Sequence, residues 1–174
     1  MVLRLSLLRH AKSSWDDPGL DDHDRPLNAR GRKAAALMGK FIAAEGLVPD
    51  RICSSTSLRT RQTLAILTQE WPAQVETQFD RALYLAEPAA LLAEVKRTPK
   101  GTSHLMLLGH NPGMEQFAAA LLASGPSNAV AAMTRKYPTA GLAVFALATE
   151  TWGKTELASA RLLRFVTPRI LESE

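Results

Sequence analysis

The sequence contains a single cysteine, Cys53, and only 6% of its 174 residues are aromatic. One cysteine excludes an intramolecular disulfide and a cysteine-rich metal site, and it fits a reducing compartment. The N-terminal apolar stretch is too short to cross a membrane, is interrupted by Arg4 and Ser6, and lacks the layout of a signal peptide. We therefore expect a cytoplasmic protein that does not associate with a membrane.

Sequence patterns that bind nucleic acids, metals or nucleotides are also missing. The net charge of +4 permits an anionic ligand, but no run of Lys and Arg carries interleaved aromatic residues, which disfavours nucleic acid as a partner. There is no HExxH-type metal spacing and no Walker-type GxxxxGK[ST] segment. The acidic run at residues 21–24 (DDHD) is interpreted as a solvated loop, because consecutive loop side chains seldom converge on one ion. We expect neither a metal nor a cofactor.

Short apolar runs mark the expected strands. They fall at residues 2–8, 51–55, 75–79, 104–108, 142–147 and 161–166. The last two are expected to be antiparallel to each other and joined by a polar turn near Gly153. Residues 16–27, which are polar and contain Pro and Gly, are expected to form a loop.

Helical patterns separate these strands. Apolar residues at helical spacing predict an amphipathic helix over residues 29–45, capped by Asn28 and ended by Gly46. Further helices are expected at residues 60–71, 88–97 and 114–123. Strands that alternate with helices need crossover connections, which favours a mainly parallel sheet covered on both faces. The prediction is one α/β domain over residues 1–174, with three layers in the order α/β/α.

Basic side chains follow three of the expected strands. Arg9 and His10 end the first strand, Arg59 and Arg61 begin the helix after the second, and His110 follows the run at 104–108. Because ligands bind beyond the carboxyl ends of parallel strands, these groups are expected to converge in one crevice. Guanidinium groups bind phosphate bidentately, one imidazole can attack phosphorus, and a second, protonated imidazole can neutralise the phosphate oxygens. The pattern predicts phosphoryl-transfer chemistry.

The segments RHAKSSW, SSTSLRTRQT and GHNPG resemble the histidine phosphatase superfamily, the phosphoglycerate-mutase-like group. The short chain and the run RHAKSSW…DRPLNARG are similar to the small phosphohistidine phosphatases within it. The resemblance covers nearly the whole chain and implies a phosphoglycerate-mutase-like fold. It implies that His10 is the nucleophile that becomes a phosphohistidine, that Arg9 and Arg59 hold the phosphate, and that His110 is the second histidine of the pocket.

Other matched positions carry less defined roles. Ser13 and Asp16 fall where relatives often have a Thr and an Asn near the phosphate, so the resemblance implies that they help to bind it. It places Arg61 outside the pocket and makes Asn28 a structural cap. Where relatives have a glycine after the histidine, this chain has Ala11, which lacks glycine's freedom at positive φ.

This sequence departs from the family pattern mainly at the position of the general acid. Many relatives that act on alcohol esters supply a Glu after the second helix, and here Leu85 stands at that place. Glu87 is the candidate acid nearby, and Asp22 and Asp24 are weaker candidates. A histidine leaving group is much less basic than an alkoxide and needs less help from an acid. The pattern therefore favours an N–P bond over an unactivated ester.

The preferred interpretation is a metal-independent phosphatase that removes phosphate from phosphohistidine on a protein, such as a phosphocarrier or a phosphorelay domain. Phosphate or sulfate is expected to bind in the pocket. Two alternatives remain open: a phosphatase of small phosphate monoesters that uses Glu87 as its acid, and a phosphate-binding module without turnover.

Overall fold

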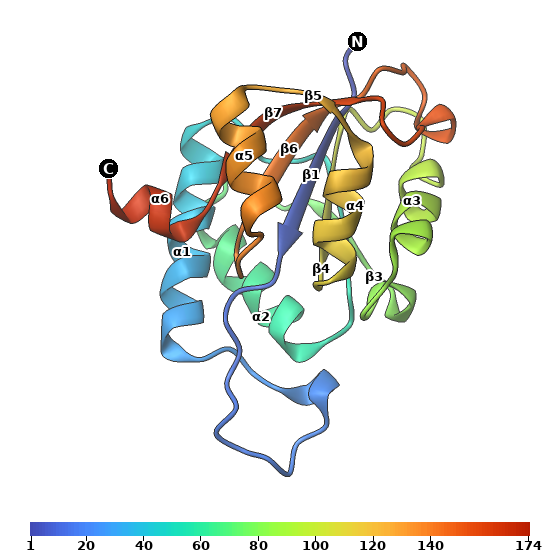
Figure 1. The fold of residues 1–174 in the computed structure, drawn as a ribbon. Helices are drawn as coiled ribbons and strands as arrows, with labels where there is room; N and C mark the ends of the chain where they lie inside the picture. Colours follow the sequence, from blue (N-terminus) through green and yellow to red (C-terminus); the bar gives the residue numbers. More distant parts are fainter.

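The computed structural model describes residues 1–174, and all its strands belong to one seven-stranded sheet (Figure 1). The strand order is β3-β2-β4-β1-β6-β7-β5. The strands are β1 (Arg4–Arg9), β2 (Arg51–Ser54), β3 (Glu76–Phe79), β4 (His104–Gly109), β5 (Leu122–Ser124), β6 (Leu142–Ala146) and β7 (Ala160–Val166). Strands β3, β2, β4 and β1 run parallel, whereas β6 is antiparallel to both β1 and β7. The expected mainly parallel sheet is confirmed.

Helices cover both faces of this sheet. They are α1 (Ala29–Ala44), α2 (Leu58–Leu67), α3 (Pro88–Lys96), α4 (Gly113–Leu121), α5 (Ser127–Arg135) and α6 (Pro168–Glu172), with 3-10 turns at Asp22–Asp24, Thr68–Glu70, Arg81–Leu83 and Trp152–Lys154. One apolar cluster packs α3, α4 and α5 against the sheet through side chains such as Leu91, Phe117 and Met133. A second cluster packs α1 and α2 on the opposite face, through Met38 and Leu64 among others. Two separate cores give the three-layer α/β/α arrangement that the sequence predicts.

Local sequence signals explain where these elements begin and end. Leu5 and Leu7 of β1 belong to one core cluster and Leu8 to the other, as expected from the two-residue period of a strand buried on both faces. The Asn28 side chain accepts a hydrogen bond from the amide of Gly31 at 2.8 Å, which caps α1. Gly46, with φ of +65°, lies just past the end of α1.

Several boundaries differ from the sequence prediction. The helix expected at 60–71 begins earlier, because Ser57 caps α2 at Thr60, and it tightens into a 3-10 turn after Leu67. The helix expected at 114–123 ends at Leu121, because the next three residues form β5 beside β7. Helices α5 and α6 were not predicted. Helix α5 fully buries only Met133, with Ala129, Val130 and Ala132 packed partly buried against the core, and α6 buries none of its residues, so both contain few large apolar residues that mark a helix in the sequence.

The carboxyl ends of β1, β2 and β4 lie at the same edge of the sheet. In the strand register Arg9 pairs with Gly109, and Ser54 pairs with Leu108. The loop that follows β1 extends from this edge and returns to α1 (Figure 1). The residues directly after these three strands are therefore neighbours in space. No helix in the structure has the length and apolar character that crossing a membrane requires.

Candidate active site

A cavity of about 410 Å³ opens at the carboxyl edge of the sheet. It is lined by Arg9, His10, Lys12, Ser13, Trp15, Asp22, Arg25, Arg59, Leu85, Asn111 and Thr139. His110 lies behind this lining, with its ring centroid 5.2 Å from that of His10. The structure thus brings together Arg9, His10, Arg59 and His110, the four residues that the sequence placed at three strand ends.

His10 is held in one tautomer by the backbone. Its Nδ1 lies 2.7 Å from the carbonyl oxygen of Ala11. Because a carbonyl oxygen can only accept, Nδ1 carries the proton, and the lone pair of the neutral ring is on Nε2. Burial lowers the pKa of His10 to about 3, and the nearby Arg59, Arg9 and Arg25 add to the effect, although the bond to Ala11 opposes it. The His10 ring is therefore neutral at pH 7, with the Nε2 lone pair free.

His110 is neutral as well. Its Nε2 is hydrogen-bonded to the hydroxyl of Ser55 at 2.8 Å, while its buried Nδ1 has no partner within the protein. Burial lowers the pKa of His110 to about 3, with further contributions from His10 and Arg59. A protonated second histidine was predicted from the sequence, but burial keeps His110 neutral in the protein without a bound phosphate. A bound phosphate dianion would raise the pKa of His110, because an opposite charge favours the imidazolium form.

The two predicted arginines keep donors free for a ligand. One guanidinium nitrogen of Arg9 donates to the carbonyl oxygen of Tyr137 at 3.0 Å. Arg59 donates to the carbonyl oxygen of Asp22 at 2.6 Å and to its carboxylate at 2.9 Å. The Nε atoms of both arginines are buried without a partner. Since a guanidinium has five donors, both residues can still bind phosphate oxygens.

Arg25 is a third arginine of the cavity and, like Arg59, is buried; it was not predicted from the sequence. Only 6% of its surface is exposed, it donates a hydrogen bond to the hydroxyl of Ser13, and its Nε has no partner. Its guanidinium lies 3.3 Å from the ring centroid of Trp15, a cation–π contact that fixes its orientation. Residues 16–27 were expected to form only a polar loop, but the DRPL run within them was the signal that could have identified Arg25.

Asp22 places a carboxylate among these cations. It accepts hydrogen bonds from the Tyr84 hydroxyl and from Arg59, and it lies 3.4 Å from Arg25. Burial opposes ionisation, but the bonds from Tyr84 and Arg59 outweigh it and hold the pKa of Asp22 below its usual value. An ionised carboxylate has no proton to give, so Asp22 is a poor general acid at neutral pH.

Comparison with known proteins places this arrangement in a family. The family described as the histidine phosphatase superfamily (branch 1) matches residues 5–83. An uncharacterized protein of Mycobacterium tuberculosis is 37% identical over 164 residues, which cover 93% of this chain and 100% of the relative. The structure of a proposed SixA phosphohistidine phosphatase from Agrobacterium tumefaciens has a TM-score of 0.80 at 30% identity, covering 95% of this chain and 98% of that one. The chain belongs to the histidine phosphatase superfamily.

The resemblance to the small branch of this superfamily is also confirmed. A proposed SixA phosphohistidine phosphatase from Nakamurella multipartita matches with a TM-score of 0.82 and 28% identity, and 97% of each chain is covered. The histidine phosphatase SixA in complex with tungstate shares the fold, with a TM-score of 0.78 at 18% identity over 97% of this chain and 99% of that one. The expected phosphoglycerate-mutase-like fold is therefore confirmed.

The remaining predicted site residues of this histidine phosphatase are only partly brought together. Ser13 lines the cavity and is hydrogen-bonded to Arg25. Asp16 is exposed and does not line the cavity, and its backbone amide donates to the Ser14 hydroxyl at 3.1 Å. Ala11 is fully buried and does not have a positive φ. The backbone at this position therefore does not need the conformational freedom of glycine.

Glu87 lies outside the cavity of this histidine phosphatase. It is exposed and occupies the N-cap position of α3, where the following Pro88 fixes the start of the helix. Leu85, with φ of +52°, lines the cavity two residues earlier. The structure therefore places an apolar side chain, not a carboxylate, on the cavity wall at this segment. Arg61 lies outside the cavity, as expected, with its Nε bonded to the carbonyl of Thr56 at 2.9 Å.

The buried histidines of this histidine phosphatase predict a stability that falls in acid. Burial lowers the pKa of His10 and His110 to about 3 and that of His104 to about 4, whereas an unfolded histidine titrates near 6.5. At pH values between the folded and unfolded pKa, these histidines are protonated in the unfolded state but neutral in the folded state. The free energy of unfolding is therefore at its full value above about pH 6.5 and decreases as the pH falls below it. Each such histidine contributes a slope of about 1.4 kcal/mol per pH unit.

Urea unfolding at pH 6.0 and pH 5.0 measures this slope. Between pH 6.0 and pH 5.0, the free energy of unfolding of His10→Gln should decrease by about 1.4 kcal/mol less than that of the wild type, because the variant has one fewer buried histidine to protonate. The exposed residue Gln74, whose side chain does not titrate, provides the control. Gln74→Ala should keep the wild-type slope, and an unchanged slope in His10→Gln would contradict a buried, neutral His10.

Proposed function

We propose that this histidine phosphatase hydrolyses phosphohistidine on a protein through a covalent phosphohistidine at His10. The observation that carries the proposal is the neutral His10 ring, anchored through Nδ1 to Ala11 in a cavity with three guanidinium groups. No cluster of three or more His, Cys, Asp or Glu side chains could hold a metal ion. The proposal therefore assigns neutralisation of the phosphate charge to Arg9, Arg25 and Arg59.

The first half-reaction forms the phosphoenzyme. The lone pair on Nε2 of His10 attacks phosphorus, and the P–N bond of the substrate breaks. Its electron pair stays on the leaving nitrogen. The other nitrogen of the substrate ring carries a proton throughout, so a neutral imidazole leaves without taking a proton from the enzyme. Free donors of Arg9, Arg25 and Arg59 hold the non-bridging oxygens, and a substrate phosphate at Arg59 competes with the Asp22 carboxylate. The bond from Nδ1 of His10 to Ala11 then stabilises the positive charge of the phosphorylated ring.

The second half-reaction restores the enzyme. Water attacks phosphorus in line with the His10 P–N bond, the electron pair of that bond returns to Nε2, and the water proton leaves with the released phosphate. The His110 ring centroid is 5.2 Å from that of His10, so His110 lies close to the position of a phosphoryl group on His10. Once a phosphate dianion raises its pKa, His110 can neutralise charge on the transferring oxygens.

The preference for an N–P bond rests on the cavity wall. Glu87 lies outside the cavity, Asp22 is held in its ionised form, and Leu85 provides only apolar contact. An alkoxide leaving group would need a proton from an acid that this wall does not offer, whereas an imidazole, with a pKa near 6.5, leaves with far less help.

Parallel turnover assays test this preference. With a chelator present, we expect kcat/KM for a histidine-phosphorylated peptide to exceed that for sugar phosphates by at least about 100-fold, since general acid catalysis contributes about 10²–10⁴-fold. The kcat/KM for an aryl phosphate, which has a weakly basic leaving group, should lie between the values for the peptide and for the sugar phosphates. Faster turnover of the sugar phosphates would favour the monoester alternative. No turnover of any substrate by a folded, phosphate-binding protein would leave only the binding module.

A pair of variants makes the same test sharper. Leu85→Glu places a carboxyl group on the cavity wall. It should raise turnover of the sugar phosphates and so reduce the ratio of kcat/KM for the peptide to kcat/KM for the sugar phosphates. Glu87→Gln should leave both rates within about twofold, as is usual for an exposed side chain away from the site. A large loss of sugar-phosphate turnover in Glu87→Gln would instead identify Glu87 as a working acid.

A further inference from the structure

A basic depression continues from the active-site cavity across the surface between α1, α5 and α6. Two hollows of about 520 and 640 Å³ form it, and they share Lys136, Pro138, Thr167 and Arg169 as common lining residues. The first hollow shares Lys12 and Thr139 with the active-site cavity. The three spaces therefore adjoin one another, and we call the two outer hollows the basic groove.

Positive charge dominates the basic groove. Its cationic lining residues are Lys12, Arg30, Lys33, Arg135, Lys136 and Arg169, whereas Glu172 is its only acidic lining residue. All six cations are exposed, and none takes part in an ion pair within the protein. A surface of this kind attracts a partner that carries several negative charges.

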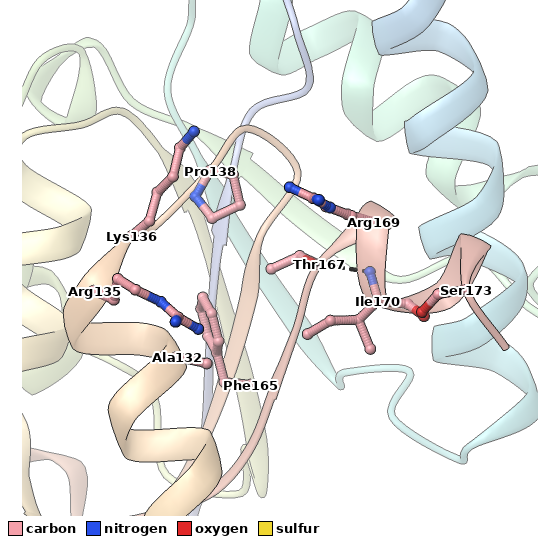
Figure 2. Close-up of a pocket in the computed structure, with 9 residues that line it drawn as sticks. All are labelled: Ala132, Arg135, Lys136, Pro138, Phe165, Thr167, Arg169, Ile170 and Ser173. Atoms are coloured by element: carbon pink, nitrogen blue, oxygen red, sulfur yellow. Dashed lines mark hydrogen bonds between the residues drawn. The ribbon is translucent and has the colours of Figure 1, made fainter.

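The outer hollow also has an apolar side. Figure 2 shows the Phe165 ring and the Ile170 side chain on either side of the hollow, with Arg135 extending over Phe165 and Arg169 extending towards Pro138. Ile170 is 38% exposed, whereas Phe165 is only 7% exposed. An exposed aliphatic residue suits the apolar side chains of a protein segment. Single-stranded nucleic acid would need exposed aromatic rings on which its bases can stack, and the groove lining offers none.

A rigid segment connects the basic groove with the catalytic arginine. Lys136, Pro138 and Thr139 line the groove, and the carbonyl of Tyr137 between them accepts hydrogen bonds from Arg9 and from the Asn111 amide, both at 3.0 Å. The Tyr137 ring is buried, and its hydroxyl donates to the carbonyl of Leu7. A segment bound in the groove therefore lies beside a fixed wall of the phosphate site.

We propose that the basic groove docks an acidic segment with interspersed aliphatic side chains, which belongs to the protein that carries the phosphohistidine. The proposal rests on the proposed function and names the chemistry of its partner. Docking would hold the phosphorylated histidine at the mouth of the cavity and lower KM for the protein substrate. It would have no effect on a small aryl phosphate, which is bound by the cavity alone.

Two peptides with one phosphorylated histidine each provide the test. One carries a tail of alternating Glu and Leu residues on both sides of the histidine, and the other carries Gln and Ser in their place. We expect kcat/KM at low salt to be at least about tenfold higher for the acidic peptide, mainly through KM. The difference should shrink at 0.5 M salt, where charges are screened within about 4 Å.

Charge-reversal variants locate the effect. The double variant Lys33→Glu/Arg169→Glu should lose the preference for the acidic peptide while keeping wild-type turnover of the aryl phosphate. The matched control Lys40→Glu/Arg161→Glu changes the net charge equally at exposed residues that do not line the groove, and it should keep the preference.

The possible failures can be told apart. If neither peptide is hydrolysed by the wild type, the proposed function fails, and the docking proposal fails with it. If both peptides are hydrolysed at equal rates, or if both double variants lose the preference equally, the docking proposal alone is overturned. An RNA oligonucleotide that inhibits more strongly than the unphosphorylated acidic peptide would also overturn protein docking in favour of nucleic acid.

Discussion

Replacing His10 with glutamine should reduce turnover of a histidine-phosphorylated peptide by at least about 10⁴-fold, as expected for loss of a nucleophile. Glutamine fills similar space and can still form a hydrogen bond, but its amide nitrogen has no lone pair available for attack on phosphorus. The arginines of the cavity remain, so the variant should still bind inorganic phosphate. A steady-state assay on the peptide, paired with phosphate titration by calorimetry, measures both properties.

His104 provides the matched control for this substitution. It is also a buried histidine with a lowered pKa, but its Nε2 is hydrogen-bonded to Ser6 at 2.8 Å and it does not line the cavity. His104→Gln should keep most of its activity in the folded fraction. If His10→Gln retains more than a hundredth of wild-type turnover, His10 is not the nucleophile.

Replacing Arg59 with methionine should lower kcat/KM for the same peptide by about 10²–10³-fold, the usual cost of removing one donor that stabilises transition-state charge. The variant also removes one of the two arginine partners of Asp22, so that only Arg25 remains to offset the Asp22 carboxylate beside the phosphate. Arg59→Lys should recover only part of the loss, because an ammonium group is a point charge and lacks the fork that binds two oxygens.

Arg61, on the same helix, is the control for Arg59. Its Nε is bonded to the carbonyl of Thr56, and its guanidinium lies 4.2 Å from the ring centroid of Phe79, outside the cavity. Arg61→Met should change kcat/KM by less than about threefold, which separates loss of the bound phosphate from a general loss of positive charge. Equal losses in both variants would contradict the assigned role of Arg59.

Strand and helix periodicity was sufficient to predict the layers of the fold and the convergence of the main site residues. Arg9 ends β1, His10 and His110 directly follow buried strands, and Arg59 lies in the first turn of α2. In a parallel sheet, these positions are neighbours whatever the details of the loops. Their proximity could therefore be predicted before their orientations were known.

The loop after β1 could not be predicted in the same way. Residues 16–27 show no apolar period, yet Arg25 is buried against Trp15 and Asp22 bonds Arg59 and Tyr84. The two Asp22 contacts join segments that are far apart in the sequence, and sequence patterns carry no information about such pairings. Asp16 and Glu87 were predicted to belong to the site, but both lie outside the cavity. Sequence spacing alone does not determine whether a side chain faces the cavity or the solvent.

The most direct test of the account is to trap the phosphoenzyme. Wild-type protein is mixed with a peptide that carries ³²P on its histidine, quenched in alkali, in which phosphohistidine is stable, and mapped by proteolysis and mass spectrometry. The account predicts label on His10 of the wild type and no label on the protein in His10→Gln. Turnover of the peptide without any labelled protein, or label on His110 instead of His10, would contradict it.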